Sequence, residues 1–254
     1  MIIAVVVFGY WYLQNNASYS GLVREVTVGP KQLNQAQFAG MFVAQEEGIY
    51  ASNGLDVSFS EYQFDTSQAD GLLEGKLDFA LMTAEDAIIL ISEGEPLVAI
   101  AAIYQISPYA IVSLESSGVT SPADFDGLVF GNKGGKVEEE LIYLLMLESV
   151  GLTKENVEIK KLGFDKREMD DLLDGDVSVV DVYRTGQLYF FDQENVAYNL
   201  LLPEQFGINI YNDILVTRSE LIDSDPELVR DFVHATVEGW DRALEDIDSA
   251  VTHT

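Results

Sequence analysis

Residues 77–104 read LDFALMTAEDAIILISEGEPLVAIAAIY, and this stretch decides the class of fold. Its apolar pattern predicts a strand over 77–82, a helix over 85–92 and a second strand over 97–104. The last segment is a continuous apolar run, as expected of a strand that is buried on both faces. Units of this kind build parallel sheets that are covered by helices.

The residues before this stretch continue the same alternation. Their patterns predict strands over 24–29 and 55–59 and helices over 38–50 and 66–75. Repetition of the strand–helix order indicates a largely parallel, doubly wound α/β sheet.

A second α/β unit follows from residue 110. Ser121-Pro122 is typical of a capped helical turn, with Ser as the cap and Pro at the first helical position. The remaining patterns predict strands over 128–131, 157–161, 177–182 and 196–202, and helices over 137–150, 166–173 and 185–192.

The chain then returns to the first unit through a strand at 214–217. A helix over 225–246 follows, with Asp225 as its cap and Pro226 at its first position. Two such units, crossed near 107–111 and 202–213, predict two lobes around a ligand-binding cleft. The expected organisation is a signal or anchor segment with a linker (1–20), lobe 1 (21–109), lobe 2 (110–205) and a return to lobe 1 (206–254).

The charge and the rare residue types exclude several functions. The 254 residues include 43 acidic and 14 basic ones, a net charge of -29, which excludes a general nucleic-acid binder and disfavours anionic lipid. Cysteine is absent, and His234 and His253 are the only histidines. Disulfides and thiolate sites are therefore excluded, and we expect no metal, no cofactor and no catalytic residues.

The N-terminal stretch 2–13, IIAVVVFGYWYL, is almost wholly apolar. Its twelve residues are shorter than the ~20 that span a bilayer, and they suit a signal-peptide core or an anchor. We therefore expect an extracytoplasmic protein, secreted or anchored through this segment.

The turn after the strand at 128–131 is the first candidate site. Asn132, Lys133, Gly134 and Gly135 stand there before a helix, whose N-terminal N–H groups suit an anion or a polar ring. A flexible strand-to-helix turn is the equally weighted alternative. In the first unit, Asn34, Gln37 and Phe38 could bind a heterocycle, or Asn34 could simply cap a helix.

Other candidates stand where predicted strands end. Thr83 and Glu85 follow one strand, although Thr83 could be only a helix cap. The remaining candidate ligand-binding residues are Tyr104, Gln105, Asp181, Tyr183, Tyr211 and Asp213. The acidic run 165–176 is interpreted as a solvated helix face rather than a calcium loop, and Trp240 as a packed helix residue.

Several segments together resemble one family. They are Gln37–Tyr50 with Gly54–Val57, Leu73–Ala80, Glu93–Val98, Gln105–Pro108, Phe206–Asp213 and Pro226–Phe232 with Gly239–Leu244. In order and spacing they resemble the solute-binding proteins for thiamine-pyrimidine precursors and alkanesulfonates, which are related to fungal pyrimidine synthases. The resemblance covers about residues 24–247.

This resemblance implies a two-lobed periplasmic-binding-protein fold of the second topological type, with a mostly parallel sheet in each lobe. It implies a monomer that closes by a hinge on a small organic ligand and works with an ABC permease. The alternatives are a ligand-sensing domain of a membrane signalling protein and, less favoured, a synthase-like enzyme.

Two departures from the family pattern matter. The synthases use a histidine and a cysteine-rich motif, whereas this chain has Phe38 and no cysteine. Pyrimidine-binding members often carry an acidic T-N-E-P segment, whereas this chain reads Thr185-Gly186-Gln187-Leu188. The ligand is therefore left open between a pyrimidine, a sulfonate and similar molecules.

Overall fold

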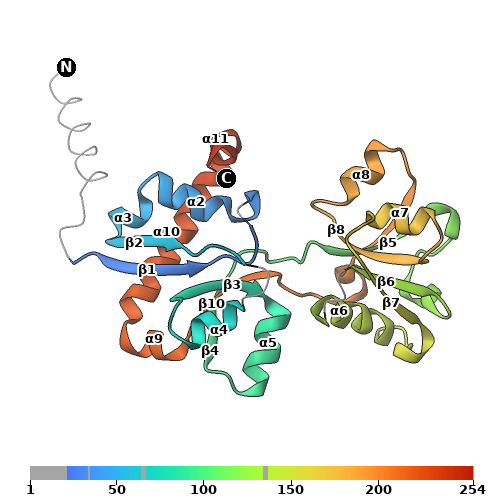
Figure 1. The fold of residues 1–254 in the computed structure, drawn as a ribbon, viewed down its shortest axis with the longest axis horizontal. Coiled ribbons are helices and arrows are strands. Elements are labelled where there is room, and N and C mark those ends of the chain that lie inside the picture. Colours follow the sequence, from blue (N-terminus) through green and yellow to red (C-terminus); the bar gives the residue numbers. More distant parts are fainter. Residues whose placement is uncertain (1–21, 34, 64–66, 134–136, 254) are drawn as a thin grey trace. The chain divides into compact units, whose positions relative to one another are not determined.

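A computed structural model describes residues 22–33, 35–63, 67–133 and 137–253. These residues form two compact units, drawn in Figure 1. The first comprises the described parts of 1–82, 87–103 and 214–254, and the second comprises those of 83–86 and 104–213. The predicted N-terminal segment and the candidates Asn34, Gly134 and Gly135 lie outside the described residues.

The first unit is built on a five-stranded sheet in the order β2-β1-β3-β10-β4. β1 (Arg24–Gly29) pairs in parallel with β2 (Leu55–Phe59) and with β3 (Phe79–Thr83). β10 (Asp213–Arg218) pairs antiparallel with β4 (Leu97–Ala102). The predicted return strand is thus confirmed, and it makes the sheet mixed.

The prediction of a strand buried on both faces at 97–104 was wrong. β4 ends at Ala102, and Leu97 is its one fully buried residue. β10 lies between β3 and β4, so β4 is the edge strand and has a neighbour on one side only. Of its three alanines, Ala99 is exposed and Ala101 and Ala102 are half-buried.

Helices α2 (Ala39–Glu46), α3 (Ile49–Ser52) and α10 (Pro226–Glu245) pack on the core of the first unit. In that core the rings of Tyr50 and Phe79 stack on Phe232, with centroids 5.5 and 4.0 Å away. The first unit also contains α4 (Gln68–Leu73), α9 (Ser219–Ser224), α11 (Ile247–Thr252) and the part of α5 (Ala84–Glu93) from Ala87 onward.

Two local predictions about α10 are confirmed. The Asp225 carboxylate accepts a hydrogen bond from the Leu228 N–H at 2.9 Å, and Pro226 is the first helical residue. Trp240 packs on α2, because a Cβ built on Gly40 would lie 2.3 Å from its indole ring. A Cβ on Gly239 would lie 2.2 Å from the Gly40 carbonyl oxygen, so glycine allows the two helices to meet backbone to backbone.

The second unit has a five-stranded sheet of the corresponding order, β7-β6-β8-β5-β9. β6 (Val129–Lys133) pairs in parallel with β7 (Glu158–Leu162) and β8 (Val179–Tyr183). β5 (Tyr109–Leu114) pairs antiparallel with β8 and with β9 (Tyr198–Leu201). This sheet is also mixed, because β5 runs against its neighbours.

Helices cover both faces of this sheet (Figure 1), and alternating side chains of β5 pack on opposite layers. Tyr109 and Ile111 share a core with α6 (Val137–Glu148), whose Tyr143 ring stacks 3.7 Å from that of Phe130. Ala110 and Val112 face the other way, toward α7 (Glu168–Leu173) and α8 (Leu188–Gln193). Because successive side chains of a strand point to opposite faces of the sheet, β5 contributes to the core on each face.

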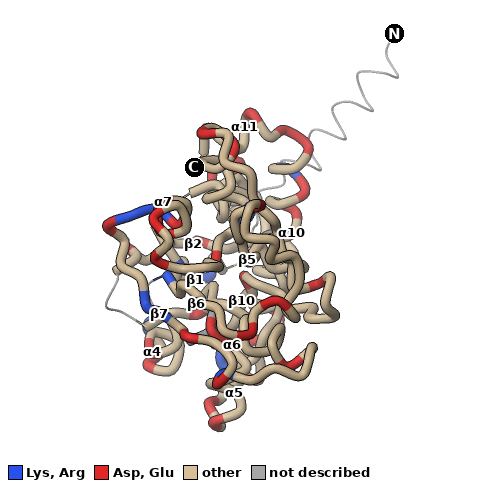
Figure 2. The backbone as a smooth tube through the Cα atoms, turned by 90° about the vertical axis from the view of Figure 1, so that its right-hand side faces the viewer, with Lys and Arg blue, Asp and Glu red and all other residues tan. Residues whose placement is uncertain are grey.

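Short 3₁₀ helices connect these elements at Ala36–Phe38, Glu115–Ser117, Pro122–Phe125, Lys154–Asn156 and Pro203–Phe206. The predicted turn at 121–125 is confirmed, since Pro122 is its first helical residue and the Asp124 carboxylate accepts a hydrogen bond from the Ser121 N–H at 2.9 Å. Acidic residues are spread over many elements and far outnumber basic ones (Figure 2). Among the described residues, no helix has the length and apolar character needed to cross a membrane.

Candidate functional site

Three strands of the second unit have their ends at one edge of the sheet. β6 and β8 run parallel and end at Lys133 and Tyr183, whereas β5 runs antiparallel and begins at Tyr109, directly opposite Tyr183. We call residues 107–109, 132–133 and 181–184 the strand-end edge. The topology therefore brings together Asn132, Lys133, Asp181 and Tyr183, four of the predicted site residues.

A hydrogen bond joins two of these strand ends. The backbone N–H of Lys133 donates to Asp181 Oδ1 at 3.0 Å, and both residues are buried. Asn132 is also buried, at 1% exposure, whereas Tyr183 is half-buried. A carboxylate that accepts a backbone N–H is stabilised in its charged form. Asp181 thus ties the end of β8 to the end of β6.

The ammonium group of Lys133 is directed to α7. Its Nζ donates to Asp171 Oδ2 at 2.9 Å and to the Lys166 carbonyl at 2.5 Å. The two charged side chains are 9% and 6% exposed. The interpretation of 165–176 as a solvated face is therefore wrong for Asp171 and for Glu168, which are both buried. Asp171 is buried because it is the counter-ion of Lys133.

The two segments that connect the units pair with each other inside the second unit. The Tyr104 N–H donates to the Asp213 carbonyl at 3.2 Å, the Asn212 N–H to the Tyr104 carbonyl at 3.1 Å, and the Ser107 N–H to the Ile210 carbonyl at 3.0 Å. We call residues 104–107 and 210–213 the crossing ribbon. These bonds hold both segments in one fixed register.

Thr83 and Glu85 are attached to this ribbon. The Ala84 N–H donates to the Asn212 carbonyl at 3.0 Å, which places residues 83–86 beside the end of the ribbon. Thr83 Oγ1 accepts from the Asp86 N–H at 3.1 Å, so the hydroxyl caps α5, as the alternative interpretation held. Glu85 is 3% exposed and lies one residue from that contact.

Asp213 is the most buried acid of this group, with 0% exposure. Burial, and in second place the nearby Asp213 carboxylate, raise the pKa of the half-buried Tyr104 phenol above its usual range. Tyr104 therefore stays a neutral phenol at physiological pH. The other ribbon candidates, Gln105 and Tyr211, are exposed.

Arg184, just after the end of β8, contacts the residues at which the crossing ribbon meets the strand-end edge. Its Nη1 donates to Glu204 Oε1 at 2.8 Å, its Nη2 to the Ser107 carbonyl at 3.2 Å and its backbone N–H to the Pro108 carbonyl at 2.8 Å. The sequence did not single out this residue. Its partners stand 20 and 77 positions away, so no local pattern could have found it.

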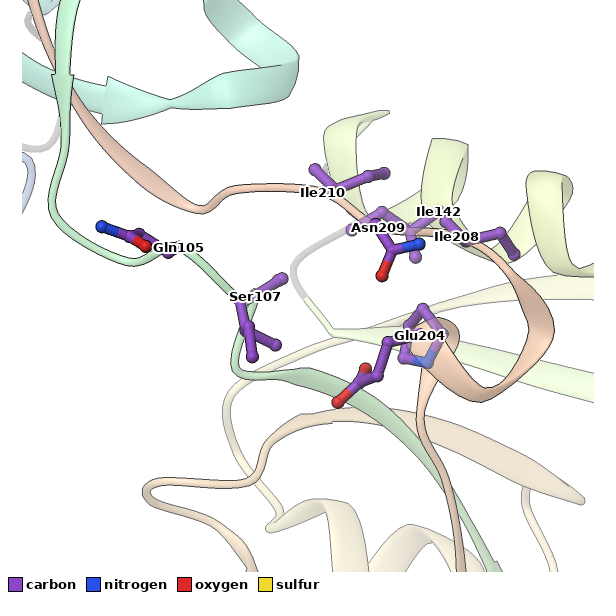
Figure 3. A pocket seen from close by; sticks show the side chains of 9 residues that line it. Gln105, Ser107, Ile142, Glu204, Ile208, Asn209 and Ile210 are labelled. Atoms are coloured by element: carbon purple, nitrogen blue, oxygen red, sulfur yellow. The ribbon is translucent and has the colours of Figure 1, made fainter.

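A pocket lies beside this arginine contact (Figure 3). The side chains of Ile142, Ile208 and Ile210 lie to one side in this view, and Glu204 and Ser107 lie opposite them. Gln105, Ile106, Pro203 and Asn209 complete the lining. The carboxylate that holds Arg184 thus also lines this pocket.

The predicted contacts of the first unit have different surroundings. Phe38 is 2% exposed and belongs to the core, where its ring meets that of Phe42 edge-on at 6.5 Å. Gln37 is half-buried and its Oε1 accepts from Gln35 Nε2 at 2.7 Å. A ligand-binding role for either residue stays a prediction.

Within residues 22–33, 35–63, 67–133 and 137–253, no three His, Asp or Glu side chains are grouped in a way that could hold a metal ion. Both histidines belong to the first unit, and His234, on α10, is exposed.

Comparisons with known proteins show the family to which the chain belongs. A family model described as NMT1/THI5 like matches residues 35–250. The riboflavin-binding protein RibY of Chloroflexus aurantiacus is 26% identical over 231 residues, which cover 90% of this chain and 65% of that protein. The formylaminopyrimidine-binding protein of Halalkalibacterium halodurans is 25% identical over 242 residues, 93% of this chain and 72% of that protein. The chain thus spans less than two thirds of the length of RibY.

Solved structures share the fold. The periplasmic aliphatic sulphonate-binding protein SsuA of Escherichia coli has a TM-score of 0.73 at 14% identity, over 91% of this chain and 77% of that one. A sulfonate-binding SsuA from Methylobacillus flagellatus has a TM-score of 0.72 at 16% identity, over 89% and 71%. At these identities the likeness concerns the fold, and it confirms the predicted type II periplasmic-binding-protein topology.

Proposed function

Because the chain belongs to the NMT1/THI5-like family, we propose that it is the substrate-binding protein of an ABC importer and captures a small organic ligand without chemical change. The relatives suggest a pyrimidine of the thiamine-precursor type, a flavin or a sulfonate as the class of ligand. In proteins of this kind, the ligand-binding site lies where strands end and where chain segments cross.

The observation that carries this proposal is the convergence at the strand-end edge. Asp181 and Tyr183 end one strand, Asn132 ends its parallel neighbour, and the crossing ribbon with Tyr104 adjoins them through Arg184. Amide, phenol and carboxylate groups there can recognise the donor and acceptor pattern of a ring, while tyrosine faces can stack on it. A ligand-binding role for Gln37 and Phe38 also remains a proposal.

Binding without chemistry agrees with the residue types available. The chain has no cysteine, and no histidine belongs to the second unit. A nucleophile of the Ser–His type needs a general base beside it. We therefore propose no catalytic residue.

Calorimetric titration of the whole chain tests this function. The panel consists of 4-amino-5-hydroxymethyl-2-methylpyrimidine, thiamine, riboflavin and short alkanesulfonates, and we expect saturable binding of at least one with a Kd in the micromolar range or below. Asp181→Asn should weaken that binding, whereas Asp223→Asn, at an exposed position of α9 in the first unit, should not. Absence of binding to every member, by a protein with a cooperative melting transition, would refute the proposal.

We further propose that the protein works outside the cytoplasm beside a permease, attached or exported through the apolar stretch at 2–13. Fractionation of cells that express the full chain tests this location. Recovery of the protein from the cytosol alone would contradict it.

A further inference from the structure

One arginine binds three segments of the second unit at a single point. Arg184 follows the end of β8, and its Nη1 donates to Glu204 Oε1 at 2.8 Å, while its Nη2 donates to the Ser107 carbonyl at 3.2 Å. Ser107 belongs to the first segment of the crossing ribbon, and Glu204 lies in the 3₁₀ helix that leads to the second segment. The guanidinium therefore connects β8 with both segments of the ribbon.

The shape of an arginine side chain suits this junction. A guanidinium is planar and holds its N–H donors in fixed directions, so one group can bind a carboxylate and a carbonyl at the same time. The Glu204 carboxylate balances the charge of Arg184, and both side chains are 27% exposed. An ion pair this close to water adds little to the stability of the whole fold. Its effect is therefore expected on the local position of the ribbon.

Main-chain hydrogen bonds continue from this junction along the ribbon. The Ser107 N–H donates to the Ile210 carbonyl at 3.0 Å. Further along, the Tyr104 N–H donates to the Asp213 carbonyl at 3.2 Å. Because these bonds hold the two segments in one register, a displacement of Ser107 is transmitted to Tyr104.

The β8 side of the junction is firmly held. Tyr183, the last residue of β8, pairs with Tyr109, which is 1% exposed. The Tyr183 N–H donates to Gln187 Oε1 at 3.0 Å, and the Gly186 N–H donates to the Tyr183 carbonyl at 2.9 Å. Arg184 thus stands in a tight turn that follows a buried strand. The ribbon is the part that its side chain can position.

We infer that Arg184 is a positioning residue of the proposed site, whose guanidinium holds the crossing ribbon against the end of β8. Tyr104 then keeps a fixed position relative to Asp181 and Tyr183 before a ligand binds. This inference rests on the proposed function, because it concerns the same site. A binding group that is already in place loses little conformational freedom on binding, and this raises affinity. Arg184 itself needs no contact with the ligand.

Amide hydrogen exchange of the whole chain tests this role without a ligand. Arg184→Met removes the guanidinium, and the amides of Tyr104 and Ser107 should then exchange at least about tenfold faster, because a charged hydrogen-bond donor no longer holds the ribbon. Amides inside β8 should exchange as in the parent chain. The matched control is Arg167→Met in the same unit. Arg167 binds Glu194 at 2.5 Å, and its replacement should leave exchange in the ribbon unchanged.

Calorimetry measures the consequence for affinity. The probes are 4-amino-5-hydroxymethyl-2-methylpyrimidine, thiamine, riboflavin and 1-butanesulfonate. Arg184→Met should weaken binding of the probe that the parent chain binds by about tenfold, since the ribbon must then be ordered during binding. Arg167→Met should bind that probe within about twofold of the parent chain, because it removes only an exposed ion pair. Arg184→Lys keeps the charge without the planar group, so it should recover part of the lost protection and affinity.

Melting curves separate this local role from a general loss of stability. Arg184→Met and Arg167→Met should lose a similar few degrees of melting temperature, while only Arg184→Met exposes the ribbon to exchange. If Arg184→Met does not fold, Glu204→Gln gives the same comparison, because it weakens the junction and keeps the arginine.

Two results would overturn the inference. Unchanged exchange at Tyr104 and Ser107 in the folded variant would do so, and a loss of affinity in that case would show that the guanidinium contacts the ligand. Faster exchange with unchanged affinity would also do so, since the position of the ribbon would then not matter for binding. Absence of binding of every probe by the parent chain would instead refute the proposed function, and the exchange comparison would still decide whether Arg184 holds the ribbon.

Discussion

Replacement of Lys133 by methionine tests whether this lysine is an internal counter-ion or a ligand contact. Methionine keeps the length of the side chain and removes its charge. In the structure the ammonium group has two partners, Asp171 and the Lys166 carbonyl, and both belong to or adjoin α7. Lys133→Met would leave the Asp171 carboxylate buried without its cation.

The size of the effect follows from burial. The Asp171 side chain is 6% exposed and its oxygen lies 2.9 Å from Lys133 Nζ. Removing one partner of a buried ion pair costs about 3–5 kcal/mol, because an uncompensated charge remains. A domain of 150–250 residues loses about 2–4 °C of melting temperature per kcal/mol, so we expect a fall of roughly 6–20 °C.

Thermal and urea unfolding of three variants measure this loss. Lys133→Met alone should be strongly destabilised. Combination with Asp171→Leu removes both charges and should return the stability to within about 1–2 kcal/mol of the parent chain. The matched control is Lys160→Met, since Lys160 is 41% exposed and lies 3.5 Å from Asp176 Oδ1. Such an exposed pair is worth at most about 1 kcal/mol.

Two results would refute the reasoning. Equal stability losses for Lys133→Met and Lys160→Met would show that Lys133 has no buried counter-ion. Parent-like stability of Lys133→Met together with lost ligand affinity would show that the ammonium group contacts the ligand.

Three further predictions concern packing and charge. Gly239→Ala should destabilise the first unit by about 1–3 kcal/mol, because its Cβ would lie 2.2 Å from the Gly40 carbonyl oxygen. Thermal unfolding followed by circular dichroism measures this loss, and Val237→Ala, at an exposed position of the same helix, should show no such loss. The Lys166 ammonium holds the pKa of the Asp176 carboxyl below its usual range, so this pair stabilises the fold above pH ~4 and its contribution is lost as the pH falls through the lowered pKa. Melting temperatures between pH 6 and pH 2 should therefore fall less steeply for Asp176→Asn, and equal slopes would contradict the pairing. The net charge of -29 should make the melting temperature rise between about 0.05 and 1 M NaCl, since salt shortens the range of repulsion between the acidic side chains to about 3 Å. An unchanged or lower melting temperature would show that this repulsion is unimportant.

Local patterns predicted most of the elements. Asp225 and Pro226 predicted the start of α10, because a helix cap and a first-turn proline act within four residues. The alternating strands at 24–29, 55–59 and 177–182 correspond to β1, β2 and β8, since apolar period-2 patterns respond to burial on a sheet. The apolar run at 97–104 led to the wrong prediction of a strand buried on both faces, because apolar composition cannot distinguish an alanine-rich edge strand from a central one.

The candidate site was predictable only in part. Strand-end residues such as Asp181 and Tyr183 could be identified because the topology of parallel strands places their ends at one edge. The roles of Lys133 and Asp171 could not, since a flexible lysine can reach outward or inward with equal ease. One signal was available, because Asp171 stands three residues after Glu168 and beside Leu172, on the buried side of a short helix.

The sequence by itself determined the fold class, the strand and helix order and the chemical limits that come from missing cysteine and scarce histidine. These properties depend on composition and on interactions within a few residues. Only the tertiary structure decided which charged side chains have partners within the protein. The bonds of Lys133 to α7 and of Arg184 to Glu204 and Ser107 join residues 20 to 77 positions apart, and such contacts exist only once the sheet has brought its strand ends together.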